Sequence, residues 1–436
     1  MAAVMKHIYQ LFILLCLLVA CTEDRIGVTP EPATSAAMVT NLPEQATVTP
    51  TPMTTIIPTT TSLASQSYPA PDNRTIGEQQ YLPLVQNENA PYPAPLVLPS
   101  TTPTATSTPT PLPTPTPTID FTAIRQQLQA SGQDLSFVKI GFHTSIGGNR
   151  HGLDVWMHRL DEAGVPFFLK SVDDAGPLFE AQQLAQASSV PHTLVYRRSG
   201  QEYDVPRYDL PPEQAAELHW QLHREVFPPE LDPNLVWIET INEVDKNQAE
   251  WLGHFALKTA ELALADGFKW AAFGWASGEP EPEQWQTPAM LDFLRLAGSN
   301  PERLAISVHE YSFLPEDIAD QYPYKVGRFQ QFYQIADQYN IPRPTLLITE
   351  WGWAYQNIPS VSQAMQHIAW AADLYAPYPQ IRGAAIWHLG CCFADVDDQT
   401  QRLIAPLTEY ALGNYFTAPL PPAQAPIDIE RKRPKP

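Results

Sequence analysis

The stretch Leu235–Asp245 reads LVWIETINEVD, and its apolar run ends in the pair Asn242-Glu243. An apolar run that changes abruptly to polar residues is typical of a strand covered on both faces, as in a parallel sheet wrapped by helices. In a barrel of parallel strands, the side chains that follow the C-terminal ends of the strands gather at one mouth, where the chemistry takes place. The stretch therefore predicts a parallel strand that places a carboxylate at a functional position.

A second stretch, Thr345–Trp353, repeats this pattern as TLLITEWGW, and its apolar run ends in Glu350. Glu243 and Glu350 are far apart in the sequence, but two strand ends of one barrel would meet at the same mouth. Hydrolysis of an acetal requires two carboxyl groups, one that gives a proton and one that attacks. Together the two stretches predict a site with two carboxylates.

From Asp120 onward the chain alternates short apolar runs with amphipathic segments. This alternation predicts parallel strands separated by helices. The eight predicted strands are Phe137–His143, Pro166–Lys170, Thr193–Tyr196, Leu235–Thr240, Trp270–Gly274, Ala305–His309, Thr345–Thr349 and Gly383–Trp387. Eight such repeats close into a barrel, so we expect an α/β fold of the (β/α)8 TIM-barrel type.

The region before Asp120 has a different character. Lys6 and His7 precede the apolar segment Ile8–Ala20, which is shorter than a comfortable membrane span and is typical of a signal peptide. The segment leads into Cys21 as LVAC, which resembles the bacterial lipobox, whose cysteine carries lipid. The alternative is an ordinary signal peptide with an accidental cysteine.

These features predict four segments of the chain. A lipoprotein signal peptide spans residues 1–20, and a disordered linker rich in Pro, Thr and Ser spans residues 21–119. The barrel domain spans residues 120–416, and a Pro-rich tail spans residues 417–436. We therefore expect an exported monomer at the cell surface, anchored to the outer face of a bacterial membrane by lipid on Cys21.

Charge and cysteine content narrow the function further. The formal net charge of −21 argues against a nucleic-acid partner. Cys391 and Cys392 are neighbours and lie outside the signal segment; adjacent cysteines rarely bridge, although an exported protein allows a disulfide. No Cys/His spacing indicates zinc, and no cofactor motif is visible, so we expect neither metal nor cofactor.

Polar and aromatic residues collect at the predicted strand ends. They are His143, Lys170, Tyr196, Asn242, Glu243, Trp275, His309, Glu310, Tyr311, Glu350, Trp351, Trp387 and His388. Tryptophan offers a flat apolar face to the C–H face of a sugar ring and an N–H group to its hydroxyls. The pattern therefore favours a carbohydrate substrate at the mouth.

With these residues the chain resembles a clan A retaining glycoside hydrolase, nearest to the cellulase-like family five, from Phe137 to about Phe416. Residues 239–243 match the E-x-x-N-E pattern of that family. The resemblance implies that Glu243 is the acid/base and that Asn242 bonds the sugar 2-hydroxyl. It also implies that Glu350 is the nucleophile.

Other family positions match residues on the later strands. The H-x-Y pattern maps onto His309 and Tyr311, with the tyrosine bonding to the nucleophile, and Trp387 maps onto the floor of the sugar subsite. The chain departs from the family where Lys170 replaces an arginine and where Tyr196-Arg197-Arg198 replaces a histidine. A barrel without catalysis is therefore an alternative.

The expected reaction is a double displacement. Glu350 would attack the anomeric carbon while Glu243 protonates the leaving oxygen, and water activated by Glu243 would then release the product with retention. The alternatives are a non-catalytic carbohydrate-binding barrel and an adhesion lipoprotein that presents the barrel.

Several residues also have a purely structural interpretation. His143, Lys170, Trp275 and Trp351 are expected to line the substrate site, but each could instead belong to the core. Glu310 is a rival nucleophile, and Glu239 is expected to be a buried, hydrogen-bonded carboxylate inside the barrel.

Overall fold

A computed structural model describes residues 119–313, 317–353, 358–393 and 395–429. The chain divides into two units, Met1–Thr106 and Ser107–Pro436. The predicted signal peptide, Cys21 and nearly all of the predicted linker lie outside the described residues. In the second unit the strands are β1 Gln133–Ser136, β2 Ile140–Ser145, β3 Phe168–Val172, β4 Thr193–Arg197, β5 Val236–Glu239, β6 Lys269–Trp275, β7 Leu304–Ser312, β8 Thr345–Trp353, β9 Ile381–Leu389 and β10 Phe416–Pro419.

Helices alternate with these strands. They are α2 Phe121–Gln129, α3 Leu153–Glu162, α4 Gly176–Ser188, α5 Gln201–Asp204, α6 Pro212–Val226, α7 Ala249–Ala265, α8 Pro282–Trp285, α9 Pro288–Ser299, α10 Phe329–Gln338, α11 Val361–Tyr375, α12 Val396–Gln401 and α13 Ile404–Gly413, with short 3-10 helices at Lys246–Gln248 and Ile318–Gln321. Among the described residues, no helix is long and apolar enough to span a membrane.

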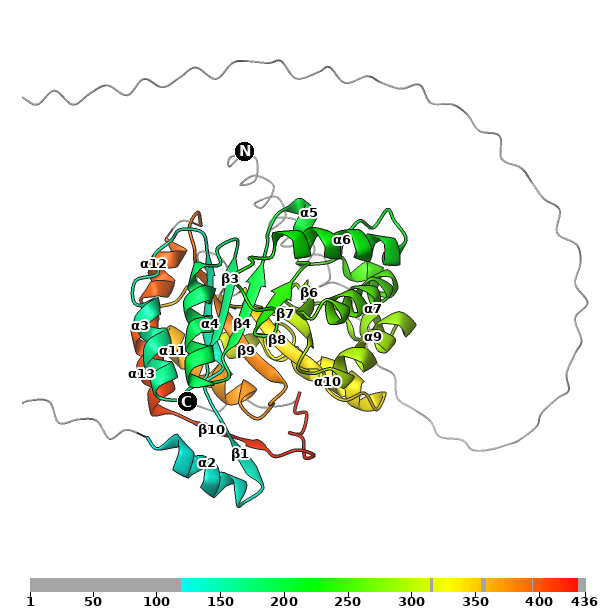
Figure 1. The fold of residues 1–436 in the computed structure, drawn as a ribbon. Helices are drawn as coiled ribbons and strands as arrows, with labels where there is room; N and C mark the ends of the chain where they lie inside the picture. Colours follow the sequence, from blue (N-terminus) through cyan, green and yellow to red (C-terminus); the bar gives the residue numbers. More distant parts are fainter. Residues whose placement is uncertain (1–118, 314–316, 354–357, 394, 430–436) are drawn as a thin grey trace, which may run out of the picture. The chain divides into compact units, whose positions relative to one another are not determined.

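Strands β2 to β9 form a closed barrel of parallel strands in sequence order. The predicted TIM barrel is therefore confirmed. Around the strands, α3 and α13 lie together on one side and α6, α7 and α9 lie together on the other (Figure 1). The barrel is closed because β9 also pairs with β2, so it has no exposed sheet edge.

The barrel interior holds a layer of side chains, one from each of β3 to β9: Phe168, Val195, Trp237, Ala271, Ala305, Leu347 and Ala385. Large and small residues share this layer, as the taper of a small barrel requires. Phe168 occupies space that glycine leaves, because a Cβ at Gly383 would lie 2.4 Å from its ring. This packed layer closes the barrel below the mouth.

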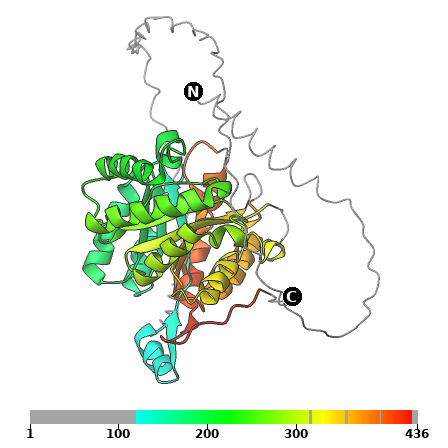
Figure 2. The ribbon, with the colours of Figure 1, turned by 90° about the vertical axis from the view of Figure 1, so that its right-hand side faces the viewer.

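A small two-stranded sheet lies outside the barrel. β1 pairs antiparallel with β10, with Gln133 opposite Pro419 and Ser136 opposite Phe416. This sheet and α2 protrude together at one end of the barrel (Figure 2). Because β1 directly precedes β2, the sheet lies at the end where the barrel strands begin, opposite to the mouth.

Strands β7, β8 and β9 continue past the ends predicted from sequence. Their pairing is interrupted by irregularities between Val308 and His309 and between Ile348 and Trp351. Such bulges change which face a side chain takes and are common beside active sites. The residues expected just after these strands therefore lie within the C-terminal parts of the strands themselves.

Candidate active site at the mouth of the barrel

Glu350 lies near the C-terminal end of β8, in a ring of hydrogen-bond donors and cations. The Tyr311 hydroxyl donates to its Oε2 atom at 2.8 Å, and Lys170 Nζ lies 3.5 Å from its Oε1 atom. His309 Nδ1 lies 3.6 Å from Oε2. Burial alone would raise the pKa of Glu350, but attraction to His309 and then to Lys170 outweighs burial and holds the pKa well below its ordinary value. Glu350 is therefore ionised at neutral pH, although the residue is only 8% exposed.

Glu243 follows β5 on a tight turn and has a φ of 48°. A non-glycine residue in this left-handed region is strained, and such strain is concentrated at functional sites. The Glu243 amide donates to the Gly274 carbonyl at 2.8 Å. Gly274 is required there, because its own φ is 52° and a Cβ would lie 3.0 Å from the Ile241 carbonyl oxygen. β6 therefore fixes the turn that carries Glu243.

One histidine links the two carboxylates. His309 Nδ1 lies 3.5 Å from Glu243 Oε1 and 3.6 Å from Glu350 Oε2. The Glu243 side chain is 39% exposed, whereas the Glu350 side chain is 10% exposed. The structure therefore brings together the two glutamates that sequence reasoning singled out, one open to solvent and one enclosed.

A buried charge network supports Glu350 from below. Lys170 Nζ lies 2.7 Å from Glu239 Oε2, and both side chains are completely buried. Thr349 Oγ1 donates to Glu239 Oε1 at 2.7 Å. Burial alone would raise the pKa of Glu239, but Lys170 and then Arg197 lower it overall. The expectation that Glu239 is a buried structural carboxylate is confirmed, and Lys170 bridges it to Glu350.

Several buried polar atoms at the mouth lack a hydrogen-bond partner among the described residues. They include both ring nitrogens of His143 and of His309, Nε2 of His388 and Oδ1 of Asn242. Burial, followed by repulsion from Lys170, holds the pKa of His143 well below its ordinary value, so its ring is neutral at neutral pH. Native proteins satisfy most buried polar atoms. The surroundings of Glu350 thus include several buried polar atoms that make no hydrogen bond among the described residues.

Aromatic residues divide into two groups. Trp387 is half-buried, and its ring meets that of Tyr311 edge-on with centroids 6.4 Å apart. Trp275 is fully buried and packs against Trp285, with ring centroids 5.8 Å apart. Trp351 is also fully buried, and its Nε1 donates to the Tyr375 hydroxyl at 3.0 Å. The structure brings Trp387 to the site but turns Trp275 and Trp351 into the packing outside the barrel.

Glu310 points away from Glu350, because it alternates with His309 along β7. Its Oε2 atom accepts hydrogen bonds from the Gly327 amide at 2.8 Å and from the Tyr375 hydroxyl at 2.6 Å. Burial raises the pKa of Glu310 to about 7. Glu310 therefore belongs to the contact between β7 and the start of α10, and the rival interpretation of Glu310 as nucleophile has no geometric support.

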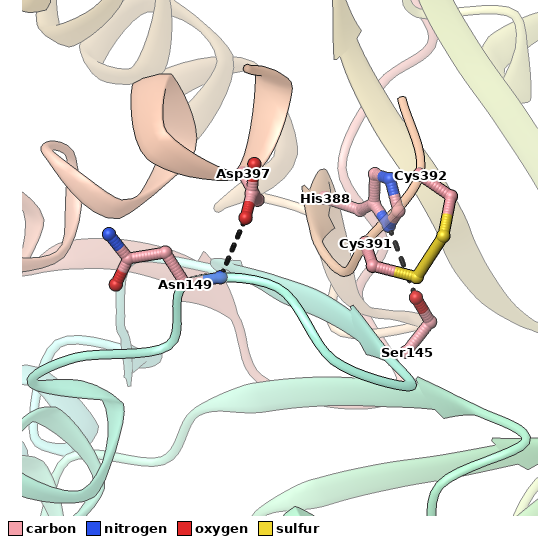
Figure 3. The surroundings of a disulfide bond; sticks show 6 residues. All are labelled: Ser145, Asn149, His388, Cys391, Cys392 and Asp397. Carbon is pink, nitrogen blue, oxygen red and sulfur yellow. Dashed lines mark hydrogen bonds between the residues drawn. A yellow bond between two sulfur atoms is a disulfide. The ribbon is translucent and has the colours of Figure 1, made fainter. Parts of the chain in front are cut away.

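Cys391 and Cys392 form a disulfide on the turn after β9 (Figure 3). Beside it, the Ser145 hydroxyl lies 3.5 Å from His388 Nδ1. Sequence reasoning left this bond open because adjacent cysteines rarely pair. Among the described residues, no group of three or more His, Cys, Asp or Glu side chains is arranged to hold a metal ion.

The comparisons with known proteins give fold neighbours at low likeness. No family model matches the chain, and no curated protein matches it. A candidate fructose-1,6-biphosphate aldolase from Coccidioides immitis is 10% identical and has a TM-score of 0.29; the match covers 67% of this chain and 92% of the other. For the YdjI aldolase from Escherichia coli the identity is 10%, the TM-score 0.28 and the coverage 67% and 94%. A mutant tryptophan synthase α-subunit from Pyrococcus furiosus is 12% identical and has a TM-score of 0.30; the match covers 64% of this chain and 97% of the other.

These findings correct the expected activity. No family model and no curated protein supports the resemblance to the cellulase-like family, and none of these three solved structures is named as a glycosidase. The prediction of a retaining glycoside hydrolase with a double displacement is therefore corrected, and this activity is not assigned to the chain. The likeness concerns the fold alone, so no aldolase or synthase activity is assigned to this chain.

Proposed function

We propose that the chain is an enzyme whose active site is the mouth of the barrel, and that it catalyses a proton-transfer reaction on a polyhydroxylated compound such as a sugar. Glu350 would be a permanently ionised group beside the reacting atoms. Glu243 would exchange protons between substrate and solvent. The observation that carries the proposal is the pair of carboxylates on either side of His309, close to buried ring nitrogens that make no hydrogen bond among the described residues.

The polar atoms indicate the class of substrate. A ligand with several hydroxyl groups both donates and accepts hydrogen bonds, so it matches the ring nitrogens of His143 and His309 and the amide oxygen of Asn242. The half-buried face of Trp387 would pack against C–H groups of the same ligand. This combination of apolar surface and convergent polar groups is typical of small-molecule sites.

The two carboxylates differ in environment, and this difference suggests their roles. Glu350 is enclosed and held ionised by cations and by the Tyr311 hydroxyl, so it is a poor proton acceptor but a strong stabiliser of positive charge that develops on the substrate. Glu243 reaches solvent and can reload its proton between turnovers. Pairs of acids in unequal environments are a common source of acid–base catalysis.

Mass spectrometry tests the proposal without assuming a reaction. The purified protein would be incubated with a panel of mono- and oligosaccharides and sugar phosphates, and any change of mass or isomer would be recorded. Glu350→Gln and Glu243→Gln should each abolish most conversion. Glu261→Gln, on the exposed face of α7, is the matched control and should convert normally. Conversion that survives in both site variants would overturn the proposal.

The position of the protein in the cell is part of the same proposal. Cys21 lies outside the described residues, and we propose that it carries the lipid that anchors a monomer to the outer face of a bacterial membrane. The linker of residues 21–119 would then act as a spacer, since Pro/Thr-rich sequence favours extended conformations. A sugar-like substrate outside the cell is compatible with this placement.

A further inference from the structure

The disulfide between Cys391 and Cys392 does not staple the fold. A disulfide stabilises a protein mainly by closing a loop in the unfolded chain, and its effect grows with the length of that loop. Here the sequence separation is one, so essentially no loop is closed. The disulfide therefore restrains mainly the backbone of its own turn, and its effect on the protein is expected to be local.

The turn that carries the disulfide belongs to the wall of the mouth. The Cys391 amide donates to the Ile146 carbonyl at 3.1 Å, which joins the turn to the segment after β2. The two segments approach so closely that a Cβ at Gly148 would lie 2.6 Å from the Gly390 carbonyl carbon. The Asn149 amide donates to Asp397 Oδ2 at 2.7 Å, which adds a second link beyond the disulfide (Figure 3).

The same turn places an aromatic ring over site residues. Phe393 follows the disulfide directly, and its ring centroid lies 4.8 Å from that of Trp387 and 5.1 Å from that of His388. The His388 ring in turn lies 5.7 Å from that of His143. The position of the disulfide turn is thus coupled, through Phe393, to the groups proposed to contact substrate.

The backbone of the turn depends on the disulfide. Cys392 has a φ of 81°, which is unfavourable for a residue with a side chain. The ring formed by the two side chains and the intervening backbone holds Cys392 in this conformation. Breaking the sulfur–sulfur bond would open this ring and remove its restraint on Cys392.

The bond is also accessible. Cys392 is exposed and Cys391 is partly exposed, so an external thiolate can reach the sulfur of Cys392. From this position we propose that Cys391–Cys392 is a reversible thiol–disulfide site, whose oxidised form holds the wall of the mouth and whose reduction by a dithiol protein or small dithiol releases it.

The exchange follows ordinary thiol–disulfide chemistry. A thiolate of the dithiol attacks Cys392 Sγ, the Sγ–Sγ bond breaks, and Cys391 leaves as a thiolate that takes a proton. The second thiol of the reductant then attacks its own sulfur in the mixed disulfide and releases the Cys392 thiolate, which is protonated in turn. Two electrons pass from the dithiol, which becomes a disulfide, to the two cysteines, which become thiols.

Hydrogen–deuterium exchange of the full chain tests the switch without a substrate. Oxidised protein and protein treated with dithiothreitol would be compared, with peptide mapping of alkylated thiols to confirm the state of Cys391 and Cys392. Reduction should raise the exchange of the Cys391 amide and of peptides across residues 145–149 at least tenfold. The double variant Cys391→Ser/Cys392→Ser should exchange like the reduced protein and should not respond to dithiothreitol.

Two results would overturn the proposal. One is complete alkylation of both thiols with unchanged exchange in these peptides, which would show a passive bond. The other is failure of dithiothreitol to reduce the folded protein. The double variant should also melt within about 2 °C of the oxidised protein, because little loop-closure entropy is involved.

The effect of the disulfide on substrate binding at the mouth rests on the proposed function and needs a separate measurement. For a compound that the protein converts, reduction should raise KM at least threefold. If reduction raises amide exchange but leaves KM unchanged, the effect of the disulfide is limited to the turn, and the proposed effect on substrate binding is wrong. If no compound is converted, the proposed function fails, while the exchange result still decides the switch.

Discussion

The hydroxyl of Tyr311 on β7 donates to the Glu350 carboxylate on the neighbouring strand β8 at 2.8 Å. Tyr311 therefore stabilises the ionised form of Glu350. The two residues depend on a bulge in this strand pair, which shifts the register between Val308 and His309. Without that shift, the site side chains of β7 and β8 would meet with a different alignment.

Tyr311→Phe removes this hydrogen bond while keeping the ring. A hydrogen bond to a charged group contributes about 1.5–3 kcal/mol, so turnover should fall about 10- to 150-fold. The pKa of Glu350 should rise, because a donor to its charged form is lost, and the acid side of the pH–activity profile should move to higher pH. Tyr415→Phe, at an exposed tyrosine, is the control. An unchanged acid limb would contradict this role.

Lys170→Met should destabilise the fold strongly. It leaves Glu239 buried without its cation, and an unpaired buried charge costs about 3–5 kcal/mol. The double variant Lys170→Met/Glu239→Gln removes both charges and should regain most of the free energy of unfolding. Chemical denaturation of the wild type, the two single variants and the double variant would show this. If the losses of Lys170→Met and Glu239→Gln simply add in the double variant, the two residues are not coupled.

Glu310→Gln should change how stability depends on pH. The folded pKa of Glu310, about 7, lies above its ordinary value of 4.5. Between these values the folded protein keeps a proton that the unfolded chain releases, so this group makes stability fall as pH rises, by about 3 kcal/mol. The variant still accepts from Gly327 and Tyr375 but does not titrate. The difference in unfolding free energy between wild type and variant should therefore grow from pH 4.5 to 7 and then level off.

Glu261→Gln controls for the loss of one surface charge in the same denaturation series, because Glu261 is exposed on α7. It should track the wild type at every pH. A difference between wild type and Glu310→Gln that stays constant with pH would show that Glu310 is ionised in the folded protein throughout this range.

Cys21→Ser should release the protein from the membrane fraction of a bacterial host. A lipidated cysteine contributes acyl chains whose burial holds the protein at the bilayer, and serine cannot be lipidated in this way. Fractionation together with metabolic labelling by a fatty-acid analogue would measure both effects. Cys16→Ser is the matched control, since Cys16 lies within the expected signal segment, and it should leave labelling intact. Labelling that persists in Cys21→Ser would refute the lipid anchor.

Much of the fold could be predicted because each barrel strand is a short apolar run. All eight runs correspond to β2–β9, with boundaries that differ by a few residues. The pair β1 and β10 was not predicted. Gln133–Ser136 is short and mostly polar, and its partner lies near the other end of the chain, so neither local pattern nor spacing indicates the pairing.

The candidate site was predictable in part. Glu243 and Glu350 were found because each interrupts an apolar run, but the orientation of the tryptophans was not. Trp275 and Trp351 follow register shifts between Ala272 and Trp275 and between Ile348 and Trp351, and the sequence does not reveal such shifts. The sequence of residues 239–243 also does not identify the reaction, because the same barrel fold supports many chemistries.

The pairing of β1 with β10 joins the segment before the barrel to the segment after it. Because these strands are antiparallel neighbours, the segment that leads into the barrel lies beside the segment that follows it, with Gln133 opposite Pro419. Beyond β10 the chain remains attached: the Arg343 guanidinium donates to the Ala425 carbonyl at 2.8 Å, and the Asp428 amide donates to Gln330 at 2.6 Å. An excised barrel that stops at Phe416 would lose this attachment, whereas one that runs to Ile429 would keep it.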